Sequence, residues 1–224
     1  MPVGLIAIFV FVAIVLVIIA AGQAGARRKA MEQWAGGRGL AFDPDRQEGF
    51  DDRFEEFSCL RQGSSRYADN VISGNWGDRA ILAFDYHYTT GSGKNRHSHS
   101  FSAVILESEI ELKDLMIRQE TFGDKMGAFF GFDDIDFESA QFSKEFYVRA
   151  SDRKWAYDVI HARTMELLLA SPRFSIQMAP RRVMAWRTSR LEPAELGQAA
   201  TLVAGILDGM PQYLLEQQAG PAGA

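Results

Sequence analysis

The sequence contains a single cysteine, Cys59, so no disulfide can form within the chain. It also contains no Asn-x-Ser or Asn-x-Thr acceptor for N-glycosylation. Both absences agree with a reducing, cytoplasmic compartment, although neither requires one.

An excess of basic residues is also missing. The chain has 24 Lys and Arg against 29 Asp and Glu, a net charge of −5 at pH 7. A general nucleic-acid binder needs a basic face, so no nucleic-acid partner is predicted.

Familiar catalytic motifs are absent. The sequence contains neither G-x-S-x-G nor H-E-x-x-H. The Gly-Ser-Gly-Lys stretch at residues 91–94 resembles part of a phosphate-binding loop, but Asn95 stands where that loop needs Ser or Thr, and Tyr88 where it needs glycine. It also joins two predicted strands. We therefore predict a hairpin tip there, and we assign no catalytic or cofactor-binding residue.

The first 26 residues carry no charged side chain, and residues 3–21 form one apolar run. As a helix this run would be about 28 Å long, close to the ~30 Å hydrocarbon core of a bilayer. We predict an uncleaved, single-pass transmembrane anchor whose partner is the lipid bilayer. The alternative is a cleaved signal peptide, which requires a basic region before a shorter apolar core.

Basic residues follow the run at Arg27, Arg28 and Lys29. Lys and Arg beside a span stay on the cytoplasmic side, so we expect the N-terminus outside and the following domain in the cytoplasm, at the cell inner membrane. A further alternative, an extracytoplasmic domain, stays open.

Composition divides the chain into four parts: a transmembrane helix at 1–23, a basic juxtamembrane helix at 24–38, a soluble domain at 39–215 and a disordered tail at 216–224. Within the domain, strands are predicted together before a helix at 153–170, a second hairpin at 174–188 and a final helix at 194–208. Because the strands do not alternate with helices, we predict an α+β fold with a mostly antiparallel sheet and two or three packed helices.

Three motifs carry a resemblance: Phe-Asp-Tyr-His-Tyr at 84–88 with Gly-Ser-Gly-Lys at 91–94, Asp-Ile-Asp-Phe-Glu at 134–138, and Phe-Ser at 142–143. With them the chain resembles a group of uncharacterised bacterial single-pass membrane proteins that have an N-terminal anchor. The resemblance implies one anchored domain and brings no assigned activity.

The histidines suggest a metal site. If the hairpin turned near Ser92, His87 would lie opposite His97, and Asp85 opposite His99. Three imidazoles and a carboxylate on one face suit zinc. A register shift of one residue would disperse them, leaving a polar hairpin end.

Five arginines gather without an acid between residues 173 and 190, at positions Arg173, Arg181, Arg182, Arg187 and Arg190. We predict that they lie on anionic lipid head groups. The alternative pairs them with the acids of neighbouring strands.

Taken together, the sequence predicts a membrane-anchored cytoplasmic binding or scaffold domain with an unknown protein partner and no catalysis of its own. The alternative function is a metal-binding enzyme or sensor that uses the histidine hairpin.

Overall fold

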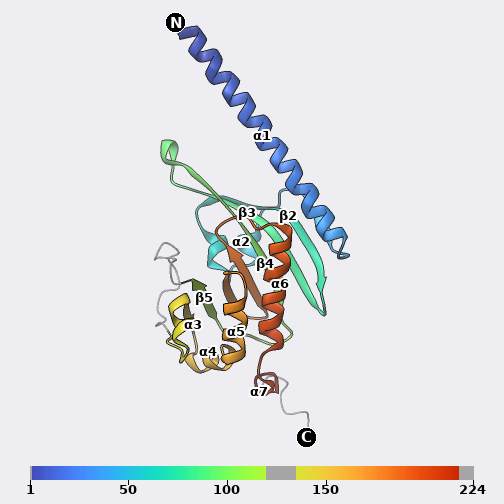
Figure 1. The fold of residues 1–224 in the computed structure, drawn as a ribbon, viewed down its shortest axis with the longest axis vertical. Coiled ribbons are helices and arrows are strands. Elements are labelled where there is room, and N and C mark those ends of the chain that lie inside the picture. Colours follow the sequence, from blue (N-terminus) through green and yellow to red (C-terminus); the bar gives the residue numbers. More distant parts are fainter. Residues whose placement is uncertain (1, 120–134, 217–224) are drawn as a thin grey trace.

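The computed structural model describes residues 2–119 and 135–216, and for most of residues 2–21 and for Leu215 it describes the backbone alone. In this part of the chain the strands form one antiparallel sheet of eight, in the order β1-β2-β3-β4-β8-β7-β5-β6. Helices cover both faces of the sheet, and α1 extends away from it (Figure 1). The predicted α+β class and antiparallel sheet are confirmed.

The strands are β1 (Ala41–Asp43), β2 (Ser64–Trp76), β3 (Arg79–Thr90), β4 (His97–Glu107), β5 (Leu115–Gln119), β6 (Phe146–Ala150), β7 (Ser175–Ala179) and β8 (Arg182–Arg187). The helices are α1 (Pro2–Gly36), α2 (Phe50–Arg53), α3 (Ala140–Glu145), α4 (Arg153–Val159), α5 (Ala162–Ala170), α6 (Pro193–Asp208) and α7 (Gln212–Glu216), with 3-10 turns η1 (Ser58–Arg61) and η2 (Gly93–Asn95).

The first helix continues without a break from Pro2 to Gly36, through the predicted division between anchor and juxtamembrane helix. It ends in a Schellman motif, in which the Leu40 amide donates to the Ala35 carbonyl and the Gly39 amide to that of Gly36. Gly39 has a φ of +68°, a conformation that costs glycine little.

Among the residues that the structure describes, no helix carries an apolar stretch of the length needed to cross a bilayer. Most side chains of residues 3–21 lie outside the described residues. Three that are described, Phe11, Ile14 and Val15, are exposed.

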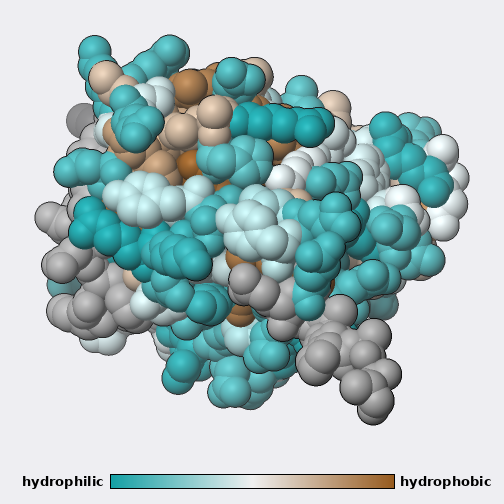
Figure 2. All heavy atoms as spheres, turned by 90° about the horizontal axis from the view of Figure 1, so that it is seen from below, coloured by the Kyte–Doolittle hydropathy of each residue, from teal (hydrophilic) through white to brown (hydrophobic). Residues whose placement is uncertain are grey.

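Two hydrophobic clusters lie on the two faces of the sheet. On one face, α1 and the helices α3–α6 bury side chains such as Met31, Trp155 and Val203. On the other, α2 and η1 cover an aromatic cluster that includes Phe50, Phe84 and Trp186. Polar side chains dominate the end of the domain farthest from the N-terminus, and a hydrophobic patch is visible near the upper edge of this view (Figure 2).

The helix predicted at 153–170 is two helices. Asp152 caps α4 by accepting a hydrogen bond from the Trp155 amide, and the chain breaks after Val159. Because of the break, Val159 and Ile160, which are adjacent in sequence, are both 1% exposed. His161 then precedes α5 and contacts the Gly209 carbonyl at 2.8 Å.

The predicted tail lies largely outside the described residues, as does the glycine-spaced segment at 121–132. The second hairpin, β7–β8, turns through Pro180 and Arg181 as expected. The structure has the predicted order of a helix, six strands, a helical region, a hairpin and α6, but α2, η1 and α3 interrupt the strands and α7 follows α6.

Candidate functional site

The strongest polar constellation in the described residues lies where α1 meets the sheet. The Arg27 guanidinium donates two hydrogen bonds to Asp85, Nε to Oδ2 and Nη2 to Oδ1, both at 2.7 Å. The side chain of Asp85 is 0% exposed and that of Arg27 is 12% exposed. This two-point geometry is the strongest form of an arginine–carboxylate pair.

Three further groups complete the cluster, which we call the α1 clamp: Arg27, Asn70, Asp85, Ser102 and Leu191. Ser102 donates its hydroxyl hydrogen to Asp85 at 2.5 Å, and Asn70 donates from Nδ2 at 3.1 Å. The Leu191 carbonyl accepts from Arg27 at 2.8 Å, while the Leu191 amide donates to the Ser102 hydroxyl at 2.9 Å. The clamp therefore joins α1, β2, β3, β4 and the segment before α6.

Electrostatics favour the charged pair. Burial acts to raise the pKa of Asp85, but the hydrogen bonds and charge of Arg27, with the bonds from Ser102 and Asn70, outweigh it, so the pKa is lowered from its ordinary value. For Arg27, burial acts to lower the pKa and the bonds to Asp85 reverse this, so its pKa is raised. Both groups stay charged at neutral pH. The carboxylate has its oxygens occupied, so the clamp suits a structural joint and not proton transfer.

The predicted pairing of the histidine hairpin is wrong. In the structure His87 pairs with Ser100, Asp85 with Ser102 and Tyr88 with His99. The turn includes the 3-10 segment η2 and is centred beyond Ser92, which shifts β4 by three residues. Because side chains alternate between the faces, an odd shift places His99 on the opposite face from His87.

The four predicted ligands consequently have separate surroundings. His97 lies opposite Thr90. The ring of His87 stacks on Tyr67 at 4.5 Å, and its Nε2 lies 3.0 Å from Asp69. The ring of His99 stacks on Tyr88 at 4.7 Å. Within the described ranges no group of three or more His, Cys, Asp or Glu side chains is placed to hold a metal ion.

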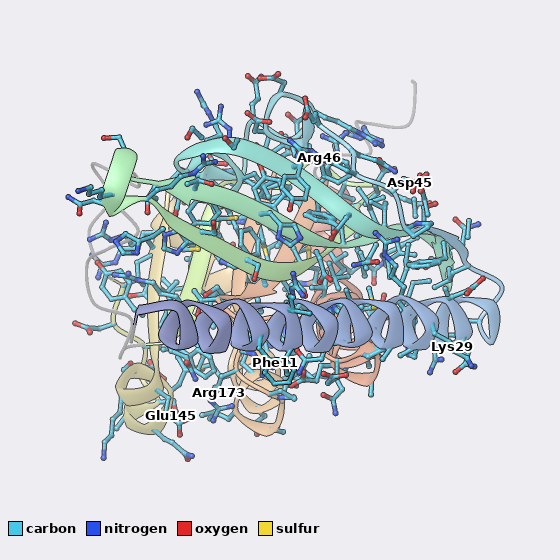
Figure 3. The ribbon with its side chains drawn as sticks, turned by 90° about the horizontal axis from the view of Figure 1, so that it is seen from above. Phe11, Lys29, Asp45, Arg46, Glu145 and Arg173 are labelled. Carbon is cyan, nitrogen blue, oxygen red and sulfur yellow. The ribbon has the colours of Figure 1, made fainter. Side chains whose placement is uncertain are left out.

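Three of the five predicted lipid-facing arginines pair with acids. Arg173 pairs with Glu145 beside the lower helices, as Figure 3 shows for the two labelled side chains. Two further pairs are Arg182 with Glu56 at 2.9 Å and Arg187 with Glu195 at 2.6 Å. Arg181 and Arg190 are exposed. Pairing with acids is thus found for three of the five arginines, but these three acids lie on α3, on α6 and between α2 and η1, not on neighbouring strands. The lipid contact stays a prediction.

A shallow groove of about 550 Å³ lies where the end of α1 meets α5 and α6. Two tryptophans line it, Trp34 from α1 and Trp76 from β2, with ring centroids 6.1 Å apart and planes 14° apart. Arg38 covers the Trp34 ring at 4.4 Å. Trp34 therefore packs against the domain, as its distance from the apolar run indicates.

Sequence reasoning missed the partner of Asp85. Arg27 was assigned only a role in membrane orientation, and 58 residues separate it from Asp85. The available signal was Asp85 itself, a carboxylate that directly follows the apolar strand residues 80–84 and therefore needs a buried partner.

No family model matches the sequence, and no curated protein matches it. A solved structure with a similar fold is that of the mycobacterial trehalose monomycolate transport factor A, TtfA. The TM-score is 0.62 at 12% identity, over 81% of this chain and 92% of that chain. At this identity the likeness concerns the fold alone.

Proposed function

We propose that this protein is a membrane-anchored adaptor: the apolar half of α1 spans the inner membrane, and the α+β domain binds a protein partner at the cytoplasmic surface without catalysis of its own. The observation that carries the proposal is the continuity of α1 between two different environments. Its residues 3–21 contain no charge, whereas Met31 and Ala35 near its other end belong to the domain core.

Exposure along α1 supports this division. Phe11 is 67% exposed and Ile14 52% exposed, whereas Met31 and Ala35 are 0% exposed. Large apolar side chains on a protruding helix need a non-aqueous partner. A bilayer suits this partner, because the run matches its thickness and a helix satisfies its own backbone hydrogen bonds there.

The α1 clamp supports a fixed connection. Arg27 follows Ala21 by six residues, about 9 Å along a helix. The domain would therefore sit directly against the membrane surface instead of hanging from a flexible linker. Arg28 and Lys29 are exposed and remain available as the positive charges that favour a cytoplasmic location.

The similar fold of TtfA, whose name describes a transport factor, agrees with an accessory role in a transport assembly. We infer that the partner belongs to such an assembly. Capture of complexes from membranes that hold the intact chain would identify it.

Cell fractionation tests the anchor. A full-length chain with a C-terminal tag should remain in the membrane pellet after an alkaline carbonate wash, and the tag should resist protease added to intact spheroplasts. A matched variant with Ile14→Arg and Val15→Arg should appear in the wash, because each arginine at mid-membrane costs about 3 kcal/mol. Recovery of a wild-type polypeptide that begins beyond Gly22 in the aqueous fraction would contradict the proposal.

A further inference from the structure

The β3–β4 hairpin extends from the sheet on the same side of the domain as the apolar half of α1 (Figure 1). Contacts along α1 explain why. Trp34 stacks on Trp76 near the β2–β3 turn. Arg27, about two helical turns before Trp34, binds Asp85 farther along β3. The helix therefore points its N-terminus toward the end of β3 that leads into the hairpin tip.

Element lengths place the tip near the level where the apolar run ends. Five residues separate Asp85 from Thr90, about 17 Å along a strand. The six residues from Arg27 back to Ala21 rise about 9 Å. The strand span exceeds the helix span by about 8 Å, so the hairpin is long enough to reach the level of Ala21, and the polar residues of its tip favour the head-group layer beside that level.

The chemistry of the tip suits that layer. All of residues 91–99 are exposed, and they include Lys94 and Arg96 but no acid. In the strands that carry the tip, no acidic residue occurs between Asp85 and Glu107. The tip also lacks large apolar side chains, so it favours head groups over hydrocarbon.

A second segment adds a positive charge beside the tip. The residues that follow η1 pair with the end of β3, Ser64 opposite Thr89, and Arg96 donates to the Ser65 hydroxyl at 3.5 Å. Arg61 at the end of η1 is exposed. Arg66 nearby is already paired with Asp51 at 2.8 Å.

We infer that Lys94, Arg96 and Arg61 form a basic contact, which we call the hairpin foot, that binds the anionic phospholipid head groups of the membrane that α1 enters. The inference rests on the proposed function, because an anchored α1 is what brings the foot to the membrane. With its own lipid contact, the domain would have two points of attachment and a fixed orientation on the bilayer.

Two single-site probes test it in the full-length chain. A bimane label at Ser92→Cys reports on the foot, and one at Ile14→Cys reports on α1. Cys59 is 2% exposed, and burial raises the pKa of its thiol, so labelling will favour the introduced cysteine. The chain is reconstituted in vesicles of phosphatidylcholine alone or mixed with phosphatidylglycerol, both with a head-group nitroxide lipid as quencher.

We expect the α1 probe to be protected from a water-soluble quencher in both vesicles, and the foot probe to be quenched by the nitroxide more strongly in the anionic vesicles than in the neutral ones. In the variant Arg61→Gln/Lys94→Gln/Arg96→Gln, the ratio of molecules whose hairpin foot contacts lipid to those whose foot does not should fall by about fivefold for each charge removed. A control, Lys154→Gln/Arg163→Gln, removes two exposed charges from α4 and α5 at the far end and should leave the quenching of the foot probe unchanged.

The two proposals fail in different ways. If the α1 probe is protected while the foot probe escapes quenching in anionic vesicles, or is quenched equally in neutral ones, the hairpin foot is wrong and the anchor stands. If the α1 probe stays open to the aqueous quencher, the anchor fails, and the foot fails with it.

Discussion

The two halves of α1 share one continuous backbone but depend on different surroundings. The docked half, residues 24–36, buries Met31 and Ala35 completely and fixes Arg27 in the α1 clamp. The apolar half, residues 2–21, has Phe11 and Ile14 exposed. Figure 3 shows Phe11 and Lys29 far apart along this helix.

This difference shows that the helix has two determinants that act separately. The docked half is held by a few side chains that pack against the sheet and α6. The apolar half is distinguished by its uncharged, hydrophobic sequence. Substitutions in the docked half should therefore change the stability of the domain, and those in the apolar half should change only its location.

Among substitutions in the docked half, loss of Arg27 should lower the free energy of unfolding most. Arg27→Met leaves Asp85 buried without its cation, and we expect the free energy of unfolding to fall by about 3–5 kcal/mol. Denaturant titration of the full-length chain in detergent micelles measures this. Arg28→Met, at the exposed neighbouring position, should stay within about 0.5 kcal/mol. Equal effects of the two variants would mean that the clamp does not hold the helix.

Truncation of Met31 should cause the second-largest loss in the free energy of unfolding. Met31→Ala removes a fully buried side chain from the contact between α1 and the sheet, so we expect a loss of about 3 kcal/mol. The matched change in the apolar half, Ile14→Ala, should leave domain unfolding within about 0.5 kcal/mol. The same denaturant titration compares them, and a similar loss from both would contradict the division of α1.

Acid should weaken the docked half selectively. The folded-state pKa of Asp85 is lowered, so the stability from its charge is present above the ordinary aspartate pKa of about 3.9 and is lost as the pH falls through the folded-state value. The stability difference between the wild type and Asp85→Asn should therefore shrink in strong acid. Other carboxylates with lowered pKa, such as Asp152 and Glu195, titrate in both proteins and cancel. A difference that stays constant throughout the acid range would show that Asp85 is not the titrating group.

Local patterns were enough to predict most of the fold. Alternating and buried runs marked β2, β3 and β4, and Glu192-Pro193 marked the start of α6, where the structure has a capping box with Glu195. Phe50, Phe54 and Phe57, whose spacing in the sequence is typical of a buried helical stripe, are at most 3% exposed. These features depend on neighbours a few residues away, which the sequence displays directly.

Features that depend on distant residues could not be predicted. The η2 turn set the register of β3 and β4, and no residue of the loop specified its length against the alternatives. The partner of Asp85 comes from another element, and the break after Val159 has no glycine or proline to mark it. The partner of Asp85 depends on how α1 packs on the sheet, whereas the turn length and the helix break have no marker in the sequence.

A glycine substitution in α6 should change the free energy of unfolding least, and it tests whether Trp34 at the end of the docked half contacts α6. Gly197 in α6 faces the tryptophan pair: a Cβ there would lie 3.2 Å from Cζ2 of Trp34 and 3.6 Å from Cη2 of Trp76. Gly197→Ala gains about 1 kcal/mol of helix propensity but must displace the Trp34 ring, so we expect a net change in the free energy of unfolding below about 1 kcal/mol.

The spectrum should respond even where stability does not. Displacement of the ring changes the geometry of the two stacked indoles, so the near-ultraviolet circular dichroism of Gly197→Ala should change. The control is Gly25→Ala in α1, where an added Cβ meets nothing within 4 Å. That variant should gain helix propensity and keep the tryptophan spectrum. A spectrum that is the same in both variants would mean that Trp34 does not rest on α6 in solution, and the docked half would then end before it.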